Sequence, residues 1–216
     1  MKSQYCRARE PFSCYSHLIG AVLSAAGLVM LLVRAAREDA APGTVLSVLL
    51  FGLSLVALYS ASAGFHHALC GENALRVLKK LDHSMIYVLI AGSYTPIVLR
   101  YMEAPAAYIF LAVIWALAAF GIVVKLIWID APRLIGTLLY LLMGWAVVFR
   151  FDVVLSMPAP AIFLLAVGGI AYTIGGVIYI AKRPNLSCTL GFHELFHLFV
   201  LAGSAAHYIM VFWFVL

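Results

Sequence analysis

The chain has 216 residues, of which 65% are hydrophobic and 11% charged, and its mean hydropathy is +1.06. This composition excludes a soluble domain, because a chain of this size would have too little polar surface to cover its core. The formal net charge of +5 calls for no nucleic-acid partner, since basic residues beside membrane helices are attracted to anionic lipid headgroups.

Long apolar runs follow one another along nearly the whole chain. A membrane-spanning helix needs about 20 predominantly apolar residues. Seven runs approach this length: Ser16–Val33, Thr44–His67, Asp82–Leu99, Ala104–Val124, Leu134–Phe149, Ala159–Ala181 and Leu190–Phe214. The first has no clear cleavage site, so we expect it to be a helix and not a signal peptide. The sequence predicts an all-α, seven-helix membrane domain over residues 1–216, with a short N-terminal segment over residues 1–15.

The basic residues predict how these helices are oriented. With seven spans, ten of the Lys and Arg residues lie on the N-terminal side: Lys2, Arg7, Arg9, Arg76, Lys79, Lys80, Lys125, Arg133, Lys182 and Arg183. Four lie on the other side: Arg34, Arg37, Arg100 and Arg150. Because cytoplasmic loops carry an excess of Lys and Arg, we expect a cytoplasmic N-terminus and a C-terminus outside. The cysteines lie on or near the cytoplasmic side, where thiols stay reduced, so we expect no disulfide.

Polar residues at the ends of three runs are predicted to lie at one depth in the membrane. Ser62 and His66 lie at the cytoplasmic end of the second run, and Asp82 begins the third. His193 and His197 lie in the first two turns of the last run. Ionisable side chains inside a membrane are costly, and they mark functional sites that face the bundle interior. We therefore expect a polar cluster in the cytoplasmic leaflet.

The residue types and spacing of this cluster favour zinc. His193 and His197 are four residues apart, which places them on one helix face. With His66 they offer three imidazoles, and three protein ligands plus an open position are the pattern of a catalytic zinc site. Asp82 could fill the fourth position or hold a water molecule there. Ser62, one turn before His66, could orient a ligand or polarise a substrate carbonyl.

Simpler roles are open for some polar residues. Asp82 could pair with Lys79, or cap the third helix. Cys70 and Cys188 are near the histidines in sequence and could offer a thiolate ligand, but no two cysteines have the spacing of a cysteine-based metal site. Single histidines in membrane helices often form hydrogen bonds across the bundle. We assign that role to four of them: His17, His67, His83 and His207.

The motifs together resemble a known family. They are Ser62-x-x-x-His66, the stretch Leu81–Tyr87 with Ala91–Pro96, His193-x-x-x-His197 followed by Gly203 and His207, and Ser16-His17-Leu18-Ile19-Gly20 near the start. In combination they resemble the hemolysin III family, the bacterial branch of the progestin and adiponectin receptor superfamily. The resemblance covers essentially the whole chain.

The resemblance implies a seven-helix protein of the bacterial inner (plasma) membrane with a cytoplasmic N-terminus. It implies zinc held by His66, His193 and His197, with Asp82 holding a water molecule beside the ion and Ser62 next to it. Receptors of this superfamily are described as hydrolysing ceramide. Bacterial members are named for haemolysis and have been linked to membrane lipid homeostasis.

These features lead to one main functional hypothesis. It is a zinc-dependent hydrolase of a membrane-lipid amide or ester, in which Asp82 moves a proton and Ser62 helps to stabilise the oxyanion. We expect the acyl chain to lie among bundle residues such as Phe65, Tyr87, Tyr94 and Phe196.

Several other functions compete with this hypothesis. The protein could be a non-enzymatic membrane sensor with structural zinc. Less favoured are a pore-forming cytolysin, since the chain is already a multispan protein, and an ion transporter, since the ionisable groups cluster in one leaflet. An intramembrane protease would use the literal H-E-x-x-H signature, in which Glu194 is the general base. Related receptors keep no acid at the position of Glu194, and His66 already offers a third ligand.

Overall fold

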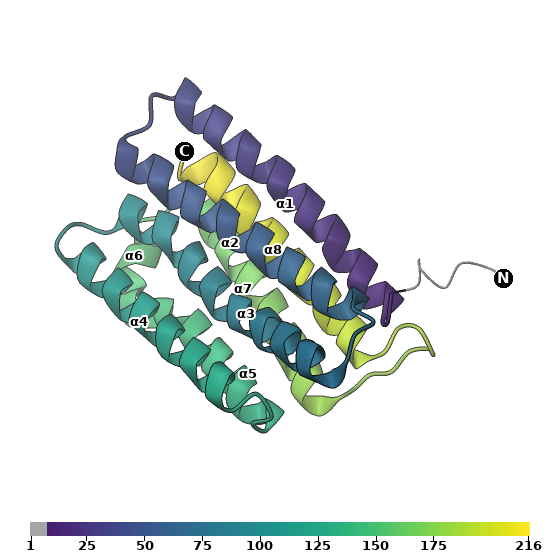
Figure 1. Cartoon of the computed structure of the whole chain (residues 1–216). Coiled ribbons are helices and arrows are strands. Elements are labelled where there is room, and N and C mark those ends of the chain that lie inside the picture. Colours follow the sequence, from purple (N-terminus) through teal and green to yellow (C-terminus); the bar gives the residue numbers. More distant parts are fainter. Residues whose placement is uncertain (1–7) are drawn as a thin grey trace.

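The apolar runs form helices that lie side by side, each antiparallel to its neighbour in the chain (Figure 1). The computed structural model describes residues 8–216 and contains no strand in that range. Its elements are α1 (Pro11–Arg37), α2 (Pro42–His67), α3 (Glu72–Tyr101), α4 (Ala106–Ile127), α5 (Arg133–Gly144), the 3₁₀ segment η2 (Trp145–Arg150), α6 (Phe151–Leu155), α7 (Ala159–Ala181) and α8 (Phe192–Phe214). The all-α prediction is confirmed. The start of α1 and the end of α8 lie at opposite ends of the bundle (Figure 1).

Six helical segments are long and apolar enough to cross a membrane. They are α1, α2, α4, the continuous stretch Arg133–Leu155, α7 and α8. The exception is α3, which has 30 residues but carries charged side chains along its first half, among them Arg76, Lys79 and Asp82. It packs against α2 and α4, and its buried side chains belong to the part from Ser84 onward, whereas Arg76 in its charged first half is 62% exposed.

The start of α3 corrects the expected position of Asp82. The helix begins at Glu72, so Asp82 lies well inside it, and the predictions that Asp82 occupies the first turn or caps the helix are wrong. Residues 72–81 are an amphipathic stretch with leucines at three-residue spacing and good helix formers between them. A search for apolar runs does not detect such a helix. The first helix also starts early, at Pro11 and not Ser16, because proline suits the first turn.

The fifth span extends beyond its expected end at Phe149 and is not a regular α-helix throughout. A 3₁₀ segment, η2, separates α5 from α6. At this break the Tyr94 hydroxyl donates a hydrogen bond to the Gly144 carbonyl, 2.7 Å away, and accepts one from the Val147 amide, 2.9 Å away. Insertion of a side chain into the helical ladder is a recognised cause of such breaks.

Glycines bring α7 and α8 close together. The His207 ring of α8 occupies the space where a Cβ at Gly168 of α7 would lie, and a Tyr172 ring carbon of α7 would lie 2.8 Å from a Cβ at Gly203 of α8. Small residues let membrane helices approach closely. This packing positions α8, the helix that carries two of the predicted zinc ligands.

Candidate metal centre

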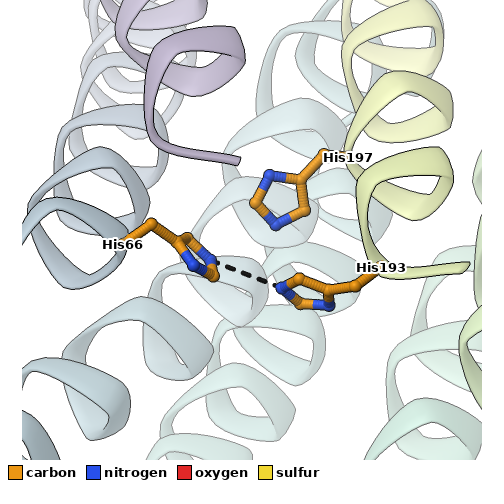
Figure 2. Close-up of side chains that lie close together, drawn as sticks. All are labelled: His66, His193 and His197. Carbon is orange, nitrogen blue, oxygen red and sulfur yellow. Dashed lines mark hydrogen bonds between the residues drawn. The ribbon is translucent and has the colours of Figure 1, made fainter. Parts of the chain in front are cut away.

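Three histidines from two helices converge at one end of the bundle. His66 lies in the last turn of α2, and His193 and His197 lie in the first two turns of α8. Figure 2 shows the three rings pointing toward one another, and each offers a nitrogen within 4.8 Å of the others. His66 and His197 are only 1% and 2% exposed. The structure brings together the three imidazoles that the sequence singled out.

The group could hold a metal ion, and the spacing of one of its nitrogen pairs matches a zinc site. Zn–N bonds are about 2.0–2.1 Å long and tetrahedral angles are usual, so two nitrogen ligands of one ion lie about 3.4 Å apart. The Nε2 atoms of His66 and His193 are 3.4 Å apart. Imidazole is a preferred zinc ligand, and three of them leave one tetrahedral position open. Cys70 and Cys188 are exposed free thiols outside this group, Cys14 is also a free thiol, and Cys6 lies outside the described residues.

Glu194 has a different role from the one the H-E-x-x-H signature suggests. Its carboxylate accepts a hydrogen bond from the Gly191 amide at 3.0 Å and one from the Ser13 hydroxyl at 3.4 Å. It therefore caps the N-terminus of α8, where an acidic side chain suits the helix dipole. This cap fixes the turn that presents His193 and engages the carboxylate with donors at the start of α8 and on α1.

Glu10 is a site residue that the sequence analysis missed. Its carboxylate accepts a hydrogen bond from Nδ1 of His66, and its backbone amide donates to the His66 carbonyl at 3.0 Å. The hydrogen bond to His66 lowers the pKa of the Glu10 carboxyl. One signal could have found it: Glu10 is the only acidic residue before Glu38, directly ahead of the first helix.

Asp82 is not among the three clustered side chains but interacts electrostatically with His66, and Ser62 lies one helical turn before His66. Both line one end of a cavity of about 370 Å³, and the Ser62 hydroxyl interacts with the Asp82 carboxylate. The suggested pair of Asp82 with Lys79 is wrong, because Lys79 pairs with Asp130 at 3.3 Å. Asp82 lines the cavity, and Nε2 of His83 lies 4.0 Å from its carboxylate.

The cavity extends through the bundle from Asp82 to Arg150 and Phe151 in the fifth span. Its walls are mostly apolar side chains of α3, the fifth span, α7 and α8. Tyr94 and Phe196 line it as expected, but Phe65 and Tyr87 do not. Phe65 packs against a ring of the metal centre (centroids 4.9 Å apart), and Tyr87 packs against a tyrosine of α5 (4.5 Å).

The remaining histidines differ in their surroundings. Nε2 of His207 donates to the Leu165 carbonyl at 3.4 Å, which confirms a hydrogen bond across the bundle. For His17 that prediction is wrong: its ring nitrogens are buried and have no hydrogen-bond partner among residues 8–216. The ring instead stacks on His197, with centroids 3.7 Å apart. His67 is exposed, and its Nδ1 lies 3.9 Å from Sγ of Cys14 on α1, a hydrogen-bonding contact between helices.

Comparison with known proteins identifies the family. The sequence matches the family described as "Haemolysin-III related" over residues 5–208. The chain belongs to the hemolysin III family. The predicted resemblance is confirmed, and this membership together with the six apolar helices makes the chain a membrane protein.

Relatives of this hemolysin III protein include bacterial and mammalian proteins. The chain is 35% identical over 203 residues to "Hemolysin-3 homolog" of Bacillus subtilis (strain 168), covering 94% of this chain and 92% of the relative. It is 33% identical over 208 residues to "Hemolysin-3" of Bacillus cereus, covering 96% and 92%. It is 29% identical over 164 residues to "Monocyte to macrophage differentiation factor" of Rattus norvegicus, covering 74% and 66%.

Proposed function

We propose that this hemolysin III family protein is a zinc-dependent, ceramidase-like hydrolase of a membrane-lipid amide or ester. One observation carries the proposal: Ser62 and Asp82 line a long, mostly apolar cavity, and the Asp82 carboxylate interacts electrostatically with His66 of the three-imidazole group. A structural zinc site needs neither an adjacent carboxylate nor space for an apolar chain. An enzyme that acts on a lipid needs both.

The proposal places the metal centre in the cytoplasmic leaflet of the bacterial inner membrane. It counts α3 as a membrane span in addition to the six apolar ones, which gives seven spans, and it assigns a cytoplasmic N-terminus. The uneven distribution of Lys and Arg supports this orientation. Arg76 and Lys79 of α3 pair with Asp130 at 2.7 and 3.3 Å, which keeps charged groups together at the end of the bundle that holds the histidines.

The residues of the site divide the proposed reaction between them. The three imidazoles would hold the zinc ion, which when bound would supply a water molecule whose pKa is lowered to about 7. Asp82 would take up the proton of the attacking water and pass it to the leaving amine or alcohol. Ser62 donates a hydrogen bond to the substrate carbonyl as negative charge develops on its oxygen. The apolar cavity holds the acyl chain and keeps bulk water away.

A direct test combines metal analysis with a lipid screen on the purified, detergent-solubilised protein. The proposal expects about one zinc ion per chain. It also expects zinc-dependent release of fatty acid from a ceramide or another N-acyl or O-acyl lipid, lost on chelation and restored by added zinc. Stoichiometric zinc without turnover of any lipid would favour the non-enzymatic membrane protein with a structural metal.

Replacement of Glu194 by Ala distinguishes a lipid hydrolase from an intramembrane protease. Because Glu194 caps α8, its loss should destabilise the protein by about 1 kcal/mol. Zinc content and lipid hydrolysis should persist under conditions where the variant is folded. Thermal unfolding, metal analysis and the lipid assay measure the three quantities. A protease would instead lose essentially all activity, since the glutamate of an H-E-x-x-H enzyme is its general base.

Replacement of Gly169 by Leu tests the proposed place of the acyl chain. Gly169 lines the cavity, and a Cβ there would meet no atom within 4 Å, so the position has room for the start of a leucine side chain. We expect kcat/KM for a long-chain substrate to fall at least about tenfold relative to a short-chain one. Gly43→Leu is the matched control, because Gly43 is equally unobstructed and does not line the cavity. An unchanged chain-length preference would place the chain elsewhere.

A further inference from the structure

Glu10, directly before α1, forms two hydrogen bonds with His66 at the end of α2. The Glu10 amide donates to the His66 carbonyl at 3.0 Å, and the Glu10 carboxylate accepts a hydrogen bond from Nδ1 of the same histidine. The neighbouring Arg9 amide donates to the His67 carbonyl at 3.4 Å. The backbone contacts hold the segment in place, and they bring the carboxylate to the ring of one predicted metal ligand.

The second ring nitrogen of His66 faces the other histidines. Nε2 lies 3.4 Å from Nε2 of His193, inside the group that could hold a metal ion. A histidine that ligates through one nitrogen carries a proton on the other, and a hydrogen bond from that N–H fixes both the tautomer and the ring orientation. A carboxylate acceptor also makes the ligating nitrogen more basic. Glu10 is correctly placed for both effects.

Other acidic side chains near the centre have different partners. Glu194 caps α8, and Asp82 interacts with Ser62. Nδ1 of His197 is buried without a hydrogen-bond partner among the described residues. Of the three candidate ligands, His66 is the one for which the described part of the chain supplies a hydrogen bond to a carboxylate.

We propose that Glu10 is a positioning residue of the metal centre, which holds His66 in the tautomer and orientation that bind zinc through Nε2. This inference rests on the zinc site of the proposed function, and it adds a fourth residue from a third part of the chain. It links the N-terminal segment to metal affinity. Glu10 touches neither the substrate nor the ion.

The test measures zinc affinity of the purified full-length protein by competition with a chelator. Loss of a group that orients a metal-bound histidine typically weakens metal binding about 10–100-fold. We expect that loss for Glu10→Ala and a smaller one for Glu10→Gln, whose amide oxygen still accepts a hydrogen bond. Glu103→Gln is the matched control, because Glu103 is exposed and lies after α3, at the end of that helix remote from His66.

Two further measurements separate positioning from simple support of the fold. The absorption spectrum of Co²⁺ bound in place of zinc should change in Glu10→Ala, because the ligand field depends on how His66 is oriented. The unfolding temperature of the metal-free protein should fall little. An unchanged affinity and spectrum with a large drop in metal-free stability would show that Glu10 only attaches the segment, and would overturn the inference.

These measurements also test the inference about Glu10 separately from the proposed hydrolase activity. If the wild type binds zinc and both Glu10 variants bind it equally well, the inference fails while the hydrolase stands. If the variants bind zinc more weakly but no lipid is hydrolysed by the wild type, the inference stands while the hydrolase fails. If the wild type binds no zinc, both are overturned.

Discussion

Replacing Asp82 by Asn should leave zinc bound and reduce hydrolysis of a lipid amide by about 100-fold or more, since general acid–base groups contribute about 10²–10⁴-fold to a rate. Asp82 is outside the group of three imidazoles, so its charge is not needed to hold the ion. Asparagine has nearly the same shape and can still contact Ser62, but it cannot take up a proton. Metal analysis and turnover of a ceramide measure the two effects separately.

Asp130→Asn is the control for this prediction. Asp130 is an exposed carboxylate at the same end of the bundle, paired with Arg76 and Lys79. Its replacement should leave both zinc content and turnover within a factor of about two, because exposed ion pairs contribute little. Normal turnover in Asp82→Asn would remove Asp82 from proton transfer. Loss of zinc in that variant would instead make Asp82 a ligand.

The convergence of the three histidines could be predicted from the sequence because it depends on helix direction. His66 ends one helix, while His193 and His197 begin another. In an antiparallel bundle such positions fall at the same end of the molecule when an even number of helices separates them, as α3, α4, the fifth span and α7 do here. The four-residue spacing then places two of the rings on one face. Neither step needs the exact boundaries of any helix.

Other parts of the site depend on contacts that periodicity does not encode. Glu10 and His66 are 56 residues apart, and their contact depends on how a nonhelical segment folds back over the end of α2. His17 carries no signal that it stacks on His197. A search for apolar runs begins the third helix at Asp82, because several of the residues before it are charged. Hydropathy identifies segments that are apolar enough to face lipid. It does not detect a polar helical segment that continues an apolar one.

The side chains that line the cavity could also be predicted only in part from the sequence. The sequence indicated that aromatic residues would surround an acyl chain, and Tyr94 and Phe196 do line the cavity while Phe65 does not. Each of these side chains has an apolar neighbourhood whichever way it points. Its direction depends on the rotation of the helix about its own axis, which for Phe196 of α8 is influenced by close packing at Gly168 and Gly203.

The largest effect on metal binding is expected for His66→Ala and His197→Ala. Each removes one of three imidazoles, and two nitrogen ligands do not make a tight zinc site. We expect the zinc content to fall from about one ion per chain to below about 0.1 after dialysis. At fixed free zinc, a thousandfold loss of affinity removes about 4 kcal/mol of stabilisation, so the unfolding temperature should fall as well. Metal analysis and thermal unfolding, with and without chelator, measure both quantities.

His67→Ala is the matched control for the metal-binding prediction, because His67 is exposed and adjacent to His66 in the chain. It should retain zinc, and chelation should lower its unfolding temperature as much as it lowers that of the wild type. In His66→Ala and His197→Ala, chelation should have little further effect, because these variants hold no zinc to remove. If they keep a full complement of zinc, or if chelation leaves the wild-type unfolding temperature unchanged, the ion does not join α2 to α8. The site would then require a different set of ligands.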